Sequence, residues 1–183
     1  MKSFHQLFLI AVITLSSAAT AQANGTTSVK ATFTSTVEAG TCTAAILDGN
    51  GATVTAIDFG DVYKSDLVAE SRTEPLKIAF TKCVGVASAS VQATPTTGGC
   101  SGSASNGNSF PASNGVAFEV WNGKADSGTL MDCNKKPAQN VSIASGSGTL
   151  DMISRIVIAS GRSITDVTTG AVSSSVTFLI TYQ

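Results

Sequence analysis

The sequence predicts an all-β sandwich, and three observations support this fold class. The residues that favour helices (Leu, Glu, Lys and Arg) are scarce, and no stretch keeps a helical period of apolar residues. Short runs that alternate between apolar and polar residues are separated by clusters of Gly, Asn and Ser, as in a sandwich of short strands. In the clearest run, at the end of the chain, one apolar face is made by Val176, Phe178, Ile180 and Tyr182. This spacing is the two-residue period of a β-strand.

The first 23 residues have the pattern of an export signal. Lys2 gives a basic start, residues 7–15 form a short apolar run, and Ala21-Gln22-Ala23 offers a small-x-small cleavage site. The apolar run is too short to span a bilayer, and no other segment approaches the ~20 apolar residues that a spanning helix needs. We therefore expect residues 1–23 to be removed and the mature chain to be exported.

Export also sets the charge of the mature chain. Removing residues 1–23 takes away Lys2 and His5, which leaves 10 of the 11 basic residues, all 12 acidic residues and no histidine. The resulting net charge of about −2 argues against a nucleic-acid partner, which needs a basic face. We expect the Lys135-Lys136 pair and the acidic residues to lie on solvated surfaces.

Candidate catalytic groups are weak throughout the sequence. No histidine remains for proton transfer near neutral pH, and paired cysteines would leave no thiolate. No Gly-x-Ser-x-Gly elbow occurs, and Gly98-Gly99 and Gly146-Ser-Gly148 are typical of flexible loops rather than of a phosphate cradle. Asp58 and Asp61 could form a carboxylate pair, but turn residues beside a strand end explain them better. The sequence therefore predicts no enzyme, no catalytic residue and no cofactor.

Four cysteines in an exported chain indicate two disulfides, and four cysteines allow three pairings. Among these we favour Cys42–Cys83 and Cys100–Cys133. The first would close a long loop between two early strands, and a native bridge of this kind typically contributes ~2–5 kcal/mol. A metal site is the weaker alternative, because no two cysteines have the CxxC spacing and the mature chain has no histidine.

The mature chain is long enough for one domain, which we place at residues 39–183 after an extension at residues 24–38. We expect strands at 54–60, from Pro75 to about Phe80, at 86–94, 116–121 and 150–158, and at the C-terminus. Cys83 is out of phase with the apolar face of the second of these, which predicts a bulge or a strand end near residues 81–83. Residues 96–114 are rich in Gly, Ser and Asn and are predicted to form a loop that Cys100 anchors. Asn122-Gly123 predicts a turn.

The extension alternates as well, with one face made by Val29, Ala31, Phe33, Ser35 and Val37. In one interpretation these residues form an ordinary first strand of their own domain. In the other, they leave the domain and add to a neighbour's sheet, which is β-strand addition. Periodicity alone does not separate the two.

Trp121 allows a function of a different class. A single Trp among polar neighbours could stack on a sugar ring, with the 96–114 loop completing the site of a secreted carbohydrate-binding adhesin module. A single Trp at a strand end more often packs beneath a loop.

The order of these features resembles the pilin subunits of chaperone–usher fimbriae of the type 1 kind. An export signal is followed by an alternating extension and a first cysteine. Four further matches are Val54-Thr-Ala-Ile-Asp-Phe-Gly-Asp-Val62 with Leu67, Leu76-x-Ile-x-Phe-x-x-Cys83, Asn114-Gly-Val-Ala-Phe-Glu-Val120, and Gly170 with Tyr182, fourteenth from the end and penultimate. Each motif is weak alone, but in this order and spacing they are specific, and they cover essentially all of the mature chain.

The resemblance implies an incomplete immunoglobulin-like sandwich that lacks its last strand and is completed by a donor strand. A groove beside the C-terminal strand would bind first a periplasmic chaperone, which also holds the carboxylate of Gln183, and then the extension of the next subunit. The implied groove and chaperone-binding residues are Gly170, Val176, Phe178, Ile180, Tyr182 and Gln183. The implied inserting residues are Val29, Ala31, Phe33, Ser35 and Val37, and the family usually has Gly where this chain has Ser35.

The function implied is that of a structural subunit of an adhesive fimbrium, assembled by donor-strand exchange. Its partners would be the periplasmic pilus chaperone, the outer-membrane usher and neighbouring subunits in a homo- or hetero-polymer. The subunit would pass through the periplasm to the cell surface, where the assembled fimbrium contacts a host surface. The extension precedes a single domain, so a two-domain tip adhesin with an N-terminal lectin domain does not fit.

Overall fold

The computed structural model describes residues 31–102 and 104–183. Its contacts define a compact domain, Val37–Gln183, which begins within the predicted extension. Residues 31–36 are exposed and have no regular secondary structure. The export signal at residues 1–23 and the start of the extension, including Val29, lie outside the described residues.

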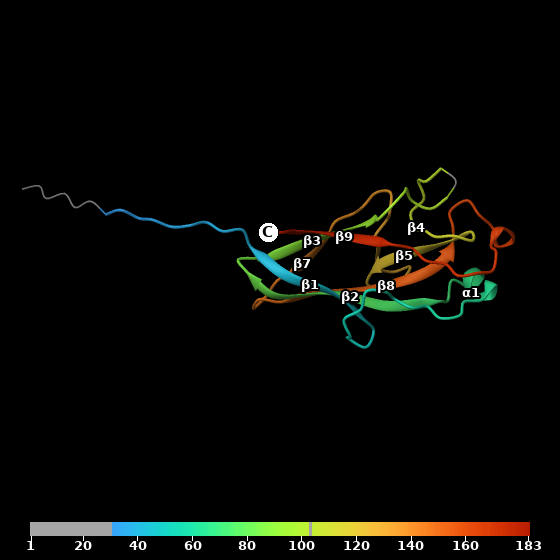
Figure 1. The fold of residues 1–183 in the computed structure, drawn as a ribbon, viewed down its shortest axis with the longest axis horizontal. Helices are drawn as coiled ribbons and strands as arrows, with labels where there is room; N and C mark the ends of the chain where they lie inside the picture. The colour runs from blue at the N-terminus through green and yellow to red at the C-terminus, as the bar shows by residue number, and fades with distance from the viewer. Residues whose placement is uncertain (1–30, 103) are drawn as a thin grey trace, which may run out of the picture. The chain divides into compact units, whose positions relative to one another are not determined.

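The domain consists of two β-sheets, in which every ladder between named strands is antiparallel (Figure 1). The larger sheet has the order β1 (Thr41–Asp48), β2 (Thr73–Val84), β8 (Gly148–Ile158), β5 (Val116–Asn122) and β4 (Phe110–Pro111), with β6 (Thr129–Leu130) also on β5. The smaller sheet has the order β7 (Gln139–Ser142), β3 (Ser88–Pro95) and β9 (Val176–Tyr182). The helical elements are α1 (Lys64–Ala69) and a short 3-10 turn, η1 (Ile164–Asp166). The predicted all-β sandwich is confirmed, and no helix in the described part of the chain is long and apolar enough to cross a membrane.

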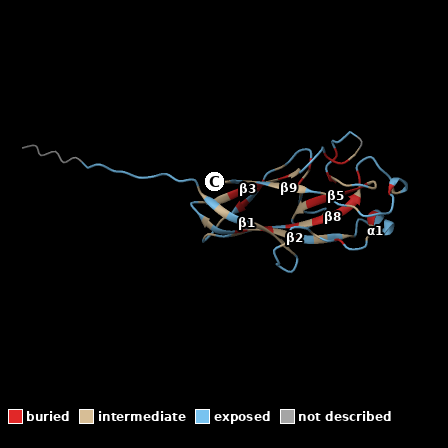
Figure 2. Ribbon diagram, in the orientation of Figure 1, coloured by how far each residue is buried: buried red, intermediate tan, exposed pale blue. Residues whose placement is uncertain are grey.

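The core lies between the sheets, where the two-residue period of the strands places alternate side chains. On β2, Leu76, Ile78 and Phe80 are buried, as their alternation predicted. Val91 of β3 and Met152 of β8 belong to the same cluster. Figure 2 shows the buried residues concentrated along β3, β5 and β8 in the middle of the domain.

The irregularity predicted near residues 81–83 is present at the β1–β2 ladder. Thr41 pairs with Val84 but Thr43 pairs with Thr81, so β2 has one residue more than β1 across this interval. Lys82, within the interval, has a φ of 52°. The extra residue explains why Cys83 is out of phase with the buried face of its own strand.

The prediction of a strand at residues 54–60 is wrong. The chain forms one bridge just before this segment, between Thr53 and Leu47, and residues 54–60 belong to no strand. Phe59 packs instead in a second core cluster, with its ring centroid 5.2 Å from that of Phe118. The guanidinium of Arg72 donates to the main-chain oxygen of Phe59. A side chain, rather than a neighbouring strand, therefore satisfies this part of the backbone.

Six elements have no counterpart in the prediction: β1, β4, β6, β7, α1 and η1, and β4 lies within the segment 96–114 that was predicted to be a loop. Residues 41–48 lack a clean alternation, since only the second half of β1 carries large apolar residues. The six residues of α1 bury a single side chain, that of Leu67, so no helical period can be seen in the sequence.

Candidate strand-acceptor groove

The two sheets each end in a strand with one free edge. Among residues 31–102 and 104–183, β9 pairs only with β3, and β1 forms its full ladder only with β2. In Figure 1, β9 (red) belongs to the upper layer of the view and β1 (blue) begins the lower one. The hydroxyl of Tyr182 donates to the main-chain oxygen of Cys42 at 3.3 Å, which joins the end of β9 to the start of β1. The free edges therefore meet at one end of the domain.

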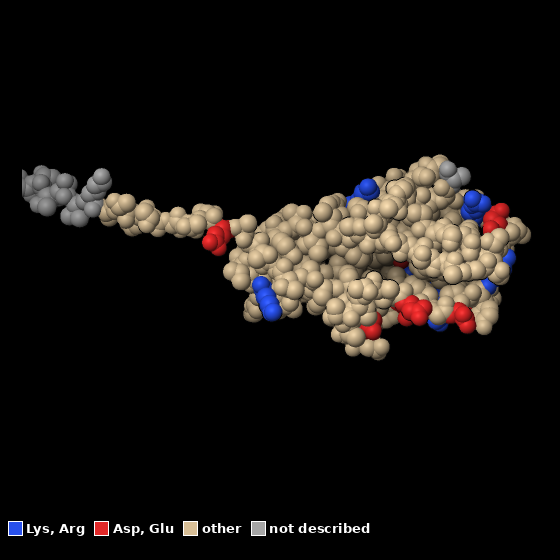
Figure 3. All heavy atoms as spheres, in the orientation of Figure 1, with Lys and Arg blue, Asp and Glu red and all other residues tan. Residues whose placement is uncertain are grey.

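The inner face of β9 is apolar but only half-buried. Its side chains pack on the main core cluster, and they are Val176, Phe178, Ile180 and Tyr182. Ile46 of β1 and Ile57 are half-buried against the same cluster. Figure 3 shows this side of the domain hollowed between the two layers. An apolar line open along its length is a groove that a further strand can fill.

The same alternation continues upstream of β9, although residues 171–175 belong to no strand. Val172 and Ser174 are half-buried, whereas Ala171, Ser173 and Ser175 are exposed. Val172 packs on the second core cluster. The Oγ atom of Ser174 is buried and has no hydrogen-bond partner among the described residues. The inner line of the groove thus runs from residue 172 to residue 182 and contains one polar side chain without a partner.

Gly170 stands just before this line. Its φ of 138° is one that residues with a side chain rarely adopt, and a Cβ atom there would lie 2.9 Å from Nδ2 of Asn114. Asn114 itself has a φ of 59° and donates to the main-chain oxygen of Ala171 at 3.5 Å. A side chain at position 170 would therefore strain the backbone at the start of this line.

The end of β9 is held by main-chain hydrogen bonds. The main-chain oxygen of Gln183 accepts from the N–H groups of Ala87 and Ser88, at 2.8 and 3.1 Å. The N–H group of Gln183 donates to the main-chain oxygen of Ser88 at 2.9 Å. The ring of Tyr182 lies edge-on to Phe80, with centroids 6.4 Å apart. A partner that binds this end meets an edge already fixed on its β3 side.

The structure pairs all four cysteines. Cys42–Cys83 joins β1 to β2, and Cys100–Cys133 ties the 96–109 loop to the segment after β6. The loop is further held by the hydroxyls of Ser101 and Ser109, which are buried and 2.6 Å apart.

The described residues of the extension expose their apolar side chains. Phe33 is 92% exposed and Val37 is 95% exposed. Ala31 and Ser35 are exposed as well, and Val29 lies outside the described residues.

Trp121 belongs to a charged cluster on the outer face of the larger sheet. Its Nε1 donates to Oε2 of Glu119 at 2.9 Å, and the guanidinium of Arg155 lies 5.7 Å from its ring centroid. The prediction that the acidic residues lie on solvated surfaces is therefore wrong for Glu119. It sits opposite Arg155 on the neighbouring strand, and the two residues are 8% and 4% exposed. An ion pair at 2.8 Å makes this burial tolerable.

Two further carboxylates complete the cluster around Arg155. Asp126 and Glu70 lie 2.7 and 3.1 Å from its Nη1 atom. Burial lowers the pKa of Arg155, but its hydrogen bonds with Asp126 and Glu119 and the nearby negative charges more than offset this, so the pKa lies above its ordinary value. The cluster links α1 and the β5–β6 loop to the sheet, which is a structural role.

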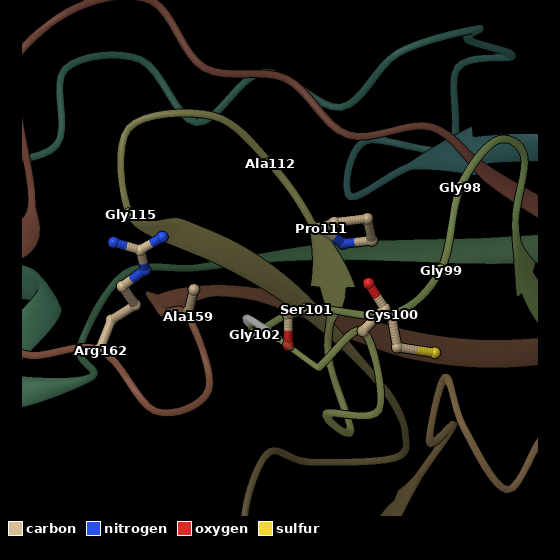
Figure 4. Close-up of a pocket in the computed structure, with 11 residues that line it drawn as sticks. Gly98, Gly99, Cys100, Ser101, Gly102, Pro111, Ala112, Gly115, Ala159 and Arg162 are labelled. Atoms are coloured by element: carbon tan, nitrogen blue, oxygen red, sulfur yellow. The ribbon is translucent and has the colours of Figure 1, made fainter.

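A separate cavity of about 300 Å³ lies beside the 96–114 loop (Figure 4). It is lined mostly by glycines and small side chains, with Arg162 as its one charged group. Trp121 is not among the lining residues. This cavity is therefore not a site formed jointly by Trp121 and the loop, as the carbohydrate-binding alternative requires.

Comparison with known proteins agrees with this geometry. No family model matches the sequence. Over 172 residues the chain is 29% identical to the uncharacterized fimbrial-like protein YadL of Escherichia coli (strain K12). The aligned region covers 86% of this chain and 86% of that protein.

Among solved structures, the P pilus rod subunit PapA is similar in fold, with a TM-score of 0.52 and 20% identity over 78% of this chain and 99% of that one. A chain from a chaperone–usher pilus structure that addresses rod uncoiling has a TM-score of 0.54 and 22% identity, over 86% of this chain and 96% of that one. The fold is thus an immunoglobulin-like pilin sandwich whose open sheets fit an incomplete fold. The resemblance to chaperone–usher fimbrial subunits that was inferred from the sequence is confirmed.

Proposed function

We propose that this chain is a structural subunit of a chaperone–usher fimbrium and that its subunits are joined by donor-strand exchange. The observation that carries the proposal is the inner face of β9, an apolar line that is half-buried along an unpaired edge. The similarity to a fimbrial-like protein and to pilus subunits supports the same role. In this role the extension of one subunit fills the groove of another.

The dimensions of the two parts agree. The inner line from residue 172 to residue 182 has the length of an extended strand of about 33 Å, at ~3.3 Å per residue. Residues 29–37 span about 26 Å on the same scale and present one apolar face. Each large apolar side chain that becomes buried contributes ~1.5–3 kcal/mol, and a ladder of main-chain hydrogen bonds adds to this. The joint is therefore strong enough to hold a fibre without any covalent bond between subunits.

The exposed apolar edge also requires a partner before assembly, because a free strand edge is a site of aggregation. A periplasmic chaperone that covers β9 from the side of Tyr182 fits this need, and an outer-membrane usher is the place where the next subunit replaces it. The subunit then resides in a fimbrium on the cell surface, where the fibre contacts a host surface. A structural role of this kind needs no catalytic residue, and we propose none.

Deleting residues 24–37 tests this function. We expect the truncated subunit to fold and to accept the extension of a full-length copy, but not to donate to the next, so that it ends each fibre. Fibre length on the cell surface, measured by electron microscopy in cells that express both forms, should fall as the share of truncated subunit rises. A length that does not respond to truncation would exclude the extension as the donor.

A matched pair of substitutions separates the loss of strand donation from the effect of adding a negative charge to the extension. Phe33→Asp places a charge on the apolar face of the extension, whereas Thr34→Asp places it on the opposite face. We expect only Phe33→Asp to shorten fibres. If Phe33→Asp leaves fibres intact but abolishes sugar binding by the free subunit, the chain is better described as a carbohydrate-binding module.

A further inference from the structure

We propose that Ser35 in the extension of one copy and Ser174 in the groove of the next form a hydroxyl pair that fixes the register of the joint. This inference rests on the proposed function. It names the contact that selects one alignment of the donor strand with residues 172–182. The strand that occupies the groove is residues 31–37 of a second copy of this chain.

The first observation is the unpartnered hydroxyl. Ser174 is the polar member of an otherwise apolar inner line, and its buried Oγ has no hydrogen-bond partner among the described residues. A buried hydroxyl without a partner is unfavourable, so a partner that arrives with the donor strand would be selected. The residue as a whole is half-buried, and rotation about its single χ angle can turn the hydroxyl toward the open side.

The second observation is that Ser35 is the polar member of the donor's inner face. When an antiparallel strand is aligned with Ser35 opposite Ser174, Val37 faces Val172. In the same alignment, each large side chain meets a smaller one: Phe33 faces Val176 and Ala31 faces Phe178. Directly opposed residues have Cβ atoms ~4.5–5.5 Å apart, which is within reach of a hydrogen bond between two serines.

An alignment shifted by two residues leaves Ser174 without a partner and opposes two large side chains. A shift of two residues toward the end of β9 places Phe33 opposite Phe178 and Ser35 opposite Val176. Ser174 then faces Val37 and stays without a partner. A shift of one residue is excluded because it turns the apolar face of the donor outward.

The donor is expected to pair along β9 rather than along β1. The far half of the β1 edge is already used, since Ile46 accepts from Val54 and Asp48 donates to Ala52, both at 3.0 Å. The edge of β9 away from β3 has no main-chain partner in the described part of the chain. Every ladder between the named strands is antiparallel, and we assign the same direction to the donor.

The antiparallel direction requires the donor to come from another copy. Tyr182 contacts Cys42, so the start of β1 lies at the far end of the groove from Val172. Val37 opposite Val172 would be about 30 Å from Cys42, at ~3.3 Å per strand residue. The five steps from Val37 to Cys42 span at most about 18 Å. A chain therefore cannot place its own Ser35 beside its own Ser174 in this alignment.

Disulfide trapping in fibres of the full chain tests the register. We expect a chain that carries both Ser35→Cys and Ser174→Cys to form covalent multimers that appear as a ladder on a non-reducing gel. Two controls are out of register: Thr36→Cys with Ser174→Cys, and Ser35→Cys with Val176→Cys. A stronger ladder from the Val176 control, or a link confined to single chains, would overturn the pairing.

These outcomes also separate the inference from the function on which it rests. If fibres form and extend but the Ser35–Ser174 ladder is absent, the register is wrong and donor-strand exchange stands. If the unmodified chain forms no fibres that depend on its extension, the proposed function itself fails.

A double-mutant cycle provides a readout that introduces no cysteine. We expect Ser35→Ala or Ser174→Ala alone to speed the dissociation of fibres in detergent about three- to tenfold, since each leaves one buried hydroxyl unpaired. The double variant should dissociate no faster than the worse single variant, because it leaves neither hydroxyl. Single effects that simply multiply in the double variant would show that the two hydroxyls do not interact.

Discussion

Strands β2 and β9 carry the same apolar alternation and contribute to the same core, yet they differ in burial. On β2, Ile78 is 1% exposed and Phe80 is fully buried, and this strand has β1 on one side and β8 on the other. On β9, Phe178 and Ile180 remain half-buried, and within the described part of the chain this strand has a neighbour, β3, on one side only. The difference shows that burial here depends on the number of neighbouring strands, not on the residue pattern. β9 has the sequence of a central strand in the position of an edge strand.

The largest effect should come from truncating matched aromatic side chains on the two strands. Phe80→Ala leaves a cavity in the closed part of the core, and we expect the free energy of unfolding of the free subunit to fall by ~3–5 kcal/mol. Phe178→Ala removes a side chain that is still partly in water, so its cost in the free subunit should be clearly smaller. Urea denaturation of both variants measures this.

The same two variants in fibres sharpen the comparison. If a donor strand completes the burial of Phe178 as proposed, truncating this side chain should destabilise fibres more than free subunits, whereas the cost of Phe80→Ala should be similar in both. Equal costs for the two variants in the free subunit would mean that the edge of β9 is not open.

An intermediate effect is expected on the outer face of the closed sheet. Arg155→Met leaves Glu119 buried without its partner, and removing one member of a buried pair typically costs ~3–5 kcal/mol. The carboxylates of Asp126 and Glu70 are largely exposed and limit the loss, so we expect about 3 kcal/mol. Lys77→Met is the control, since its pair with Asp151 is at the surface and worth at most ~1 kcal/mol. If both variants cost the same in urea denaturation, the cluster around Arg155 is not a buried one.

The smallest effect concerns the contact that joins the open edges. Tyr182→Phe removes the hydrogen bond to Cys42 but keeps the ring beside Phe80, and we expect a loss of ~0.5–1.5 kcal/mol in the free subunit. Thr181→Val, on the exposed face of the same strand, should change the free energy of unfolding by less than ~0.5 kcal/mol. Thermal unfolding of the two variants side by side would reveal whether the edges are joined at Tyr182.

The sequence predicts those parts of the fold that depend on local periodicity. β5, β8 and β9 alternate, and the strands predicted there agree with the observed ones, whereas β2 runs past its predicted end near Phe80 to Val84. The segment at 54–60 alternates too, but Arg72, which binds its backbone from another part of the chain, draws it away from the sheet. β1 forms although its pattern is weak, because its partner strand β2 sets its ladder.

The candidate site also has features that the sequence predicts and features that it does not. The inner face of β9 could be predicted because it is a property of one strand. Two features could not: the burial of Glu119, which depends on Arg155 from a strand 36 residues away, and the unpartnered hydroxyl of Ser174. Both depend on what surrounds a side chain in space. The assigned roles of Gly170, Gln183 and the extension stay predictions until the variants are measured.

The Cys42–Cys83 disulfide has a consequence for a fibre under tension. In a fibre joined through the extension, the pulling force on each subunit enters at Val37 and reaches Cys42 five residues later. There the covalent bond to Cys83 transfers the load to β2, which is hydrogen-bonded on both edges, before it can peel β1 from the sheet. At the other end, a donor strand placed lengthwise along β9, as proposed, would have its hydrogen bonds loaded together in shear instead of one at a time. In such a fibre, a covalent bond would anchor the chain where force enters, and a ladder of hydrogen bonds would anchor it where force leaves.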